Sequence, residues 1–113
     1  MNEGFHTDEF GKSWPTINAP VIIVSRHPGA IAWLLEKYPE LADVPIKAEV
    51  TAADVVGAVV IGNLPLHLAA QALHVVVIEF TGAPPRGAEY GPEEMDKCGA
   101  RLRTYYVKRA LEM

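Results

Sequence analysis

The chain has 113 residues, half of them hydrophobic, with 14 acidic and ten basic residues and a formal net charge of -4. These values fit one globular domain with a modest core. The acidic balance argues against a general DNA- or RNA-coating protein, but it leaves room for one small anionic ligand in a local basic pocket. A single cysteine, Cys98, excludes an internal disulfide, and no hydrophobic run reaches membrane-spanning length. We therefore expect a cytoplasmic protein that binds neither membrane nor genomic nucleic acid.

Hydrophobic periodicity along the chain alternates between the pattern of strands and that of helices. Three runs rich in β-branched residues predict buried strands, over residues 20–25, 58–61 and 75–78. Residues 46–50 alternate between hydrophobic and polar and predict an edge strand. Prolines and helical spacing predict three helices, over residues 28 to about 38, 66 to about 73, and 92 to about 109. Thr51 and Asp54 have the spacing of a helix cap and predict one short helical turn.

The helical patterns also predict which side chains are buried. We expect Leu66 to face the core and Trp33 to lie off the centre of the buried face of its helix. Met95 and Leu102 fall on one hydrophobic stripe of the last predicted helix, and Lys97 and Arg101 share another face of it. The basic pair is interpreted as a solvated face or, alternatively, as a basic rim over an anion site.

The alternation of strands and helices predicts an α/β fold. We expect a single Rossmann-like domain of about four parallel strands in the order 2-1-3-4, with helices on both faces. The winding then reverses between the first and third strands, and open α/β sheets bind ligands beyond the strand ends at such a point. Residues 1–19 have no clear period and are interpreted as a flexible or loosely packed extension before a domain spanning residues 20–113. Residues 81–91 predict a loop long enough to act as a lid.

The loop after the first strand contains the strongest candidate site, Ser25-Arg26-His27-Pro28-Gly29-Ala30. Pro28 suits the first turn of a helix, while Gly29 and Ala30 leave room for a ligand near N–H groups that attract anions. Arg26 can pair with two phosphate oxygens at once, and His27 can act as a general acid or base near neutral pH. We expect this loop to bind a phosphate.

The loop after the third strand should face the first loop across the crevice, and it reads Gly62-Asn63-Leu64-Pro65. Asn63 could orient a ribose or phosphate, and His67, one turn into the next helix, could assist. Ordinary structural roles stay open for these side chains: Arg26 as an ion-pair partner, His27 as a packing or capping residue, His67 as a helix histidine with its hydrogen bonds satisfied and Asn63 as a turn residue. No acidic cluster of the metal-binding type accompanies the two loops, so we expect neither a metal nor a cofactor.

The two loops resemble a small Rossmann-like CRISPR-associated family that accompanies type III systems. Two further segments add to the resemblance, His67-Leu68-Ala69-Ala70 and Gly99-Ala100-Arg101-Leu102. It covers about residues 21–109, and the most specific part is Ser25 to Ala30. The third-strand loop has Asn63 where the family often has threonine. The resemblance implies a homodimeric ring nuclease that opens cyclic oligoadenylate, the messenger of type III systems. Cyclic tetra-adenylate, the commonest substrate of that class, is the expected ligand.

The residues are compatible with this chemistry because a cyclic RNA supplies its own nucleophile, the ribose 2′-OH. An enzyme need only align that hydroxyl, stabilise charge on the phosphoryl oxygens and move protons. Arg26 and His27 are therefore the predicted catalytic residues. An alternative is a protein that binds and sequesters the same messenger without cutting it. A third is a phosphohistidine-type phosphatase, which Pro28 after Arg26-His27 disfavours.

Overall fold

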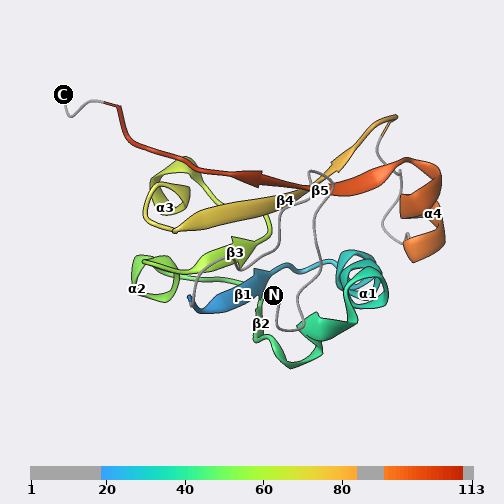
Figure 1. Cartoon of the computed structure of the whole chain (residues 1–113), viewed down its shortest axis with the longest axis horizontal. Coiled ribbons are helices and arrows are strands. Elements are labelled where there is room, and N and C mark those ends of the chain that lie inside the picture. Colours follow the sequence, from blue (N-terminus) through green and yellow to red (C-terminus); the bar gives the residue numbers. More distant parts are fainter. Residues whose placement is uncertain (1–18, 84–90, 111–113) are drawn as a thin grey trace, which may run out of the picture.

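A five-stranded sheet forms the centre of the protein in the computed structural model, which describes residues 19–83 and 91–110 (Figure 1). The expected extension, apart from Ala19, and most of the expected lid loop lie outside the described residues. In chain order the elements are β1 (Val21–Val24), α1 (Pro28–Lys37), the 3-10 helix η1 (Pro39–Asp43), β2 (Ile46–Lys47), α2 (Ala52–Val55), β3 (Val59–Ile61), α3 (Leu66–Ala69), β4 (His74–Phe80), α4 (Pro92–Lys97) and β5 (Ala100–Tyr105).

The strand order is β2-β1-β3-β4-β5, and the first four strands in this order run parallel. The predicted α/β class and the 2-1-3-4 order are therefore confirmed, as is the reversal of winding between β1 and β3. The sheet differs from the prediction by a fifth strand, which pairs antiparallel with β4. β5 is therefore one edge strand of the sheet, and β2 is the other.

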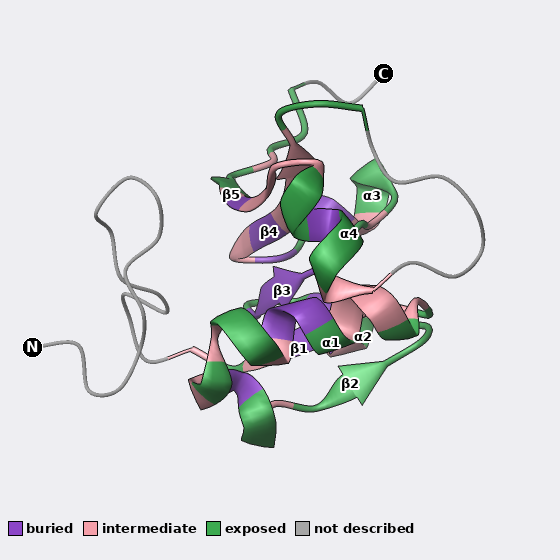
Figure 2. Ribbon diagram, turned by 90° about the vertical axis from the view of Figure 1, so that its right-hand side faces the viewer, coloured by how far each residue is buried: buried purple, intermediate pink, exposed green. Residues whose placement is uncertain are grey.

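Helices cover both faces of the sheet, as predicted (Figure 1), and each face has its own hydrophobic core. The central strand β3 is buried along its whole length (Figure 2). Side chains of α1 and α4 pack on one face, and side chains of α2 and α3 pack on the other. The first core contains Ile23, Trp33, Leu34, Leu41, Val59, Ile61, Val76, Met95 and Leu102. The second contains Ile22, Val55, Ala58, Val60, Ala69, Ala72 and Val75. Alternate residues of the central strands thus point to opposite cores, which explains their unbroken hydrophobic sequence.

The predicted last helix over residues 92 to about 109 is wrong beyond Lys97. The chain turns at Gly99, whose φ of +76° is rarely adopted by residues with a side chain. A Cβ atom there would lie 1.9 Å from Oγ1 of Thr81. The chain then returns as β5, and Met95 and Leu102 reach the same core from a helix and a strand. Lys97 and Arg101 therefore do not share a helix face.

Two burial predictions for the earlier helices are also wrong. α3 ends at Ala69 after one turn, so Leu66 lies at its exposed start with 77% of its surface accessible. Trp33 is buried in the first core, 2% exposed, because α4 packs against the side of α1 that carries it. Its indole N–H donates to Oδ1 of Asp96 at 2.9 Å. This hydrogen bond satisfies the polar end of an otherwise buried ring.

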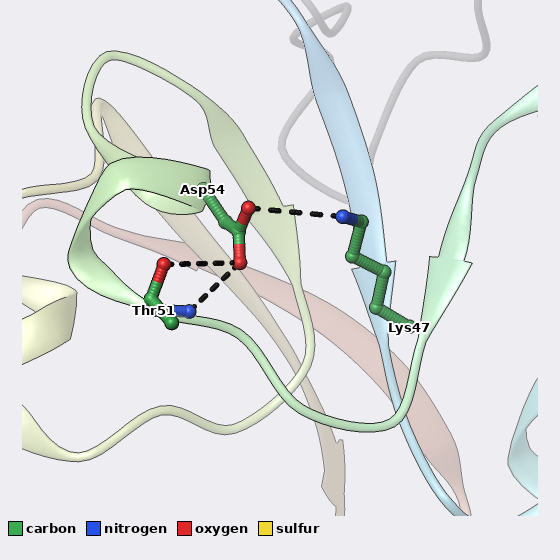
Figure 3. Close-up of polar contacts among 3 residues, drawn as sticks. All are labelled: Lys47, Thr51 and Asp54. Carbon is green, nitrogen blue, oxygen red and sulfur yellow. Dashed lines mark hydrogen bonds and ion pairs between the residues drawn. The ribbon is translucent and has the colours of Figure 1, made fainter.

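The predicted cap between the second strand and the next helix is confirmed, although the strand itself stops at Lys47. The N–H of Thr51 donates to Oδ2 of Asp54 at 2.8 Å, and the Thr51 hydroxyl contacts the same oxygen at 3.2 Å (Figure 3). Lys47 lies 3.7 Å from the other carboxylate oxygen. The backbone hydrogen bond from Thr51, helped by the charge of Lys47, lowers the pKa of Asp54. The carboxylate therefore joins the start of α2 to the neighbouring edge strand.

Candidate functional site

A cavity of about 210 Å³ lies where β1 and β3 end, at the point predicted from the strand order. It is lined from the first loop by Ser25, His27 and Ala30 and from the second loop by Gly62 and Asn63. Val24, Leu34, Ile61, Ile78, Phe80 and Met95 complete the lining. The structure therefore brings the two predicted loops together around one hollow.

The first loop is held by backbone hydrogen bonds at both of its ends. The N–H of Ser25 donates to the carbonyl oxygen of Lys47 at 3.0 Å, which fastens the end of β1 to β2. The hydroxyl oxygen of Ser25 accepts the N–H of His27 at 3.1 Å. His27 is the N-cap residue of α1, and its carbonyl accepts the N–H of Ile31 at 3.1 Å. These contacts place the half-buried imidazole of His27 between a strand end and the start of a ten-residue helix, beside N–H groups that favour anions.

The second loop approaches the first so closely that only glycine fits at its first position. Gly62 has a φ of +145°, and a Cβ atom built on it would lie 2.1 Å from the carbonyl oxygen of Val24. Its N–H donates to the carbonyl of Val76 at 2.8 Å. Gly62 thus packs against the end of β1 while remaining bonded to β4. The next residue, Asn63, lines the cavity with an exposed side chain.

The inner wall of the cavity is hydrophobic, and sequence analysis did not assign these residues to a site. Ile61 pairs with Val76, so Ile78 and Phe80 extend beyond the end of β3 and form a wall beside the crevice. Leu34 and Met95 contribute from α1 and α4. A period-two pattern in Val76, Ile78 and Phe80 was the available signal, but it marks a buried strand face as readily as a binding wall. The resulting hollow has polar groups from its loops and an apolar interior, as small-molecule sites commonly do.

Arg26, a predicted catalytic residue, is not among the residues that line the cavity. Its side chain is 69% exposed, and one guanidinium nitrogen lies 2.5 Å from a carboxylate oxygen of Glu49. The ion pair joins the loop after β1 to the segment after β2. Exposed pairs of this kind contribute little, typically about 0–1 kcal/mol, so a phosphate could replace the carboxylate. The structure therefore places Arg26 next to the site rather than inside it.

The remaining predicted ligand-binding residues divide into loop supports and one outlier. Pro28, Gly29, Leu64 and Pro65 flank the lining residues without lining the cavity themselves. Pro28 is the first residue of α1, and Pro65 is the N-cap of α3. His67 lines a different hollow, together with Lys108 and Arg109, because α3 carries it away from the crevice. The structure does not bring His67 to the predicted site.

Among residues 19–83 and 91–110, His27 is the one residue with a titratable side chain that lines this cavity. Within the same part of the chain, no group of three or more His, Cys, Asp or Glu side chains is arranged to hold a metal ion. None of the helices described is both long and apolar enough to cross a membrane. The arrangement offers one imidazole, one hydroxyl and one amide around an apolar hollow, and these groups can hold and deprotonate a hydroxyl-bearing ligand.

Comparison with known proteins identifies a family. Residues 22–108 match the model of a family described as "Putative CRISPR-associated protein (Cas_VVA1548)". No curated protein and no solved structure matches the chain. The matched range contains both loops of the cavity and all five strands except Val21, the first residue of β1.

Proposed function

The chain belongs to this CRISPR-associated family, and on that premise we propose that it binds cyclic tetra-adenylate at the crevice and linearises it, switching off type III CRISPR signalling. The observation that supports the proposal is the cavity at the ends of β1 and β3, which His27 and Asn63 line together with apolar side chains. Apolar walls suit a nucleobase, and the helix start beside His27 suits a phosphate.

The cavity size decides how such a ring would sit. Pockets that enclose a drug-sized ligand measure about 300–1,000 Å³, and the cavity here measures about 210 Å³. One nucleotide unit would therefore enter, and the rest of the ring would lie outside. A ring of even size has two-fold symmetry, so a homodimer could hold it with two such cavities.

The proposed reaction needs no external nucleophile. The ribose 2′-oxygen attacks the adjacent phosphorus, the new 2′-O–P bond forms, and the P–O5′ bond breaks. His27 takes the 2′-hydroxyl proton, and the departing 5′-oxygen gains a proton from a general acid or solvent. The product is a linear oligoadenylate with a 2′,3′-cyclic phosphate at one end. A metal ion is not required for this step, because a charged side chain and helix N–H groups can stabilise the phosphoryl oxygens.

Arg26 would join the site by exchanging partners. Its ion pair with Glu49 is exposed, and the two non-bridging oxygens of a phosphodiester offer the guanidinium a two-point hydrogen-bonded contact. Glu49 would therefore compete with the phosphate for Arg26. Replacing Glu49 with glutamine should release Arg26 and tighten ligand binding.

The same ion pair favours a second candidate function, a protein that binds the messenger without cutting it. If Arg26 stays with Glu49, the cavity retains His27 and hydrogen-bonding groups but no cation that touches the phosphate. Such a site could hold a ring while providing little stabilisation to the transition state. Product formation separates the two candidates.

The test is incubation of the pure protein with cyclic tetra-adenylate and EDTA, followed by chromatography and mass spectrometry. We expect linear products ending in 2′,3′-cyclic phosphate. His27→Ala should slow cleavage by about 10²–10⁴-fold, the usual contribution of a general acid or base. His74→Ala is the matched control, because His74 begins β4 at the opposite end of the parallel strands.

Each outcome of this experiment is informative. Intact ring that co-elutes with the protein would overturn cleavage and support the sequestering function. Failure of the ring to bind at all would overturn both functions. A His27→Ala protein that cleaves as fast as His74→Ala would remove His27 from the chemistry.

A further inference from the structure

The polar side chains that line the crevice differ in the hydrogen bonds that they already make. The hydroxyl oxygen of Ser25 accepts the N–H of His27, and the imidazole of His27 is half-buried at the start of α1. Asn63 is exposed, and its side-chain amide has no hydrogen-bond partner within residues 19–83 and 91–110. The crevice therefore has one amide whose donor and acceptor are both available to a ligand.

The residue before this amide fixes the position of its backbone. The N–H of Gly62 donates to the carbonyl of Val76 at 2.8 Å, and the carbonyl of Val24 lies so close that a side chain at Gly62 would collide with it. Asn63 therefore follows a backbone that is held between β1 and β4. A side chain placed in this way loses little freedom when it meets a ligand, because only its own bonds need to rotate.

The two loops of the crevice suit different parts of a nucleotide. The first loop leads into the ten-residue α1, whose free N–H groups and nearby Arg26 suit a phosphate. The second loop leads into α3, which is one turn long and follows Pro65, a residue without an N–H. None of the described residues that line the cavity is lysine, arginine, aspartate or glutamate. A phosphate is therefore expected on the side of His27, and the edge of the base on the side of Asn63.

The chemistry of a side-chain amide matches the edge of adenine. Adenine presents a 6-amino donor beside a ring-nitrogen acceptor, and an amide presents an acceptor beside a donor in one plane, so two hydrogen bonds form at once. A hydroxyl has one oxygen to offer, and the two nitrogens of an imidazole point in different directions. Among the described residues that line the cavity, Asn63 alone has a side chain that can make this pair of contacts.

From the available amide, its fixed backbone and the apolar wall beside it, we propose that Asn63 determines the specificity of the crevice by recognising adenine at the 6-amino group and the ring nitrogen beside it. The base lies against Ile78 and Phe80, and its edge faces Asn63. This inference rests on the proposed function, because it takes the ligand to be an oligoadenylate, but it does not require that the ring be cut. Asn63 is a binding residue and takes no part in proton transfer.

The test compares two cyclic tetraribonucleotides, one with adenine bases and one with purine bases, which lack the 6-amino group. The preference is measured as the ratio of kcat/KM where the rings are cut and as the ratio of Kd where they stay intact, so it serves both candidate functions. The parent protein should prefer the adenine ring by about tenfold or more, because the purine ring leaves the oxygen of Asn63 unpaired. Asn63→Ala should not distinguish the two rings.

Two further variants separate the amide from the rest of the site. Asn63→Asp keeps the oxygen that accepts the 6-amino group, so it should still prefer the adenine ring although its charge weakens the binding of both rings. Gln71→Ala is the matched control, because it removes an exposed amide that does not line the cavity, and it should keep the preference of the parent. Far-UV circular dichroism checks that the variants fold, as expected for changes at exposed positions.

The possible failures are distinguishable. A parent protein that cuts or binds both rings equally would overturn this inference and leave the proposed function intact. An adenine preference that Asn63→Ala retains would overturn it by assigning the base to other groups. Weaker binding of both rings by Asn63→Ala, with an unchanged ratio, would overturn it by placing Asn63 on the ribose or phosphate. Absence of both cleavage and binding would overturn the proposed function and this inference together.

Discussion

The loops after β1 and β3 have the same sequence pattern, a hydrophobic strand, a polar turn, a proline and a helix, but they lead to different structures. Pro28 begins the ten-residue α1, which buries Trp33 and Leu34. Pro65 precedes the four-residue α3, which buries only Ala69. The first loop therefore contributes Ser25, His27 and Ala30 to the cavity, whereas the second contributes only its first two residues, Gly62 and Asn63.

The difference shows that a loop motif places side chains only as far as the following helix holds them. α1 contacts α4, and its N-terminal residues stay beside the crevice. α3 is a single turn, and its first two residues already line the hollow shared with Lys108 and Arg109. Short helices gain little from their own hydrogen bonds, so packing decides where they point.

The largest expected effect is on the free energy of unfolding, and it distinguishes a buried side chain of α1 from an exposed side chain of α3. Trp33→Ala should lower the free energy of unfolding by about 3–5 kcal/mol, because it leaves a large cavity in the first core. Leu66→Ala, at the exposed start of α3, should change it by less than about 0.5 kcal/mol. Urea denaturation followed by far-UV circular dichroism measures both. Similar losses for the two variants would show that α3 is as firmly packed as α1.

The next effect tests how closely the two loops are packed together. Gly62→Ala should cost about 2–4 kcal/mol, because the new methyl group would meet the carbonyl of Val24 and the backbone φ is unfavourable. Gly57→Ala is the control: its φ is +72° but the space around it is open, so it should cost about 1–2 kcal/mol. The same denaturation experiment compares them. If Gly62→Ala is no worse than Gly57→Ala, the loops can separate freely.

Much of the sheet was predictable because its strands are short, hydrophobic and rich in β-branched residues. The runs at 21–24, 59–61 and 75–78 have no competing interpretation as long helices. β5 was missed because Met95 and Leu102 fit a helical stripe as well as a helix followed by a strand. Only tertiary structure shows that Gly99 turns the chain beside Thr81, and a lone glycine does not exclude a helix.

The position of the candidate site was predictable from the sequence, but the set of residues that line it was not. The strand order located the crevice, and Gly62 was placed there by its position after β3. The pairing of Arg26 with Glu49 depends on where the segment after β2 lies, 23 residues further along the chain. The apolar wall of Ile78 and Phe80 depends on β4 extending beyond β3. Neither arrangement leaves a local signal in the sequence.

The smallest expected effect concerns the attachment of α1 to α4, which α3 does not share. Asp96 accepts the indole N–H of Trp33 and lies 3.1 Å from Nζ of Lys37. The hydrogen bond from Trp33, followed by that from Lys37, lowers the pKa of Asp96 below its ordinary value of 3.8. The carboxylate therefore stabilises the fold fully above about pH 4, and this contribution is lost as the pH falls through the lower pKa of the folded state.

Asp96→Asn keeps an oxygen that can accept the indole N–H but removes the charge. We expect this variant to be less stable than the parent protein near neutral pH and equally stable at an acid pH well below the ordinary value of 3.8, where Asp96 is protonated in the parent. Urea midpoints at the two pH values give the comparison, and Asp43→Asn, at the exposed end of η1, controls for the loss of one negative charge. A deficit that persists unchanged in acid would mean that the asparagine disturbs the packing of Trp33, and that α1 is held by shape rather than by the charge of Asp96.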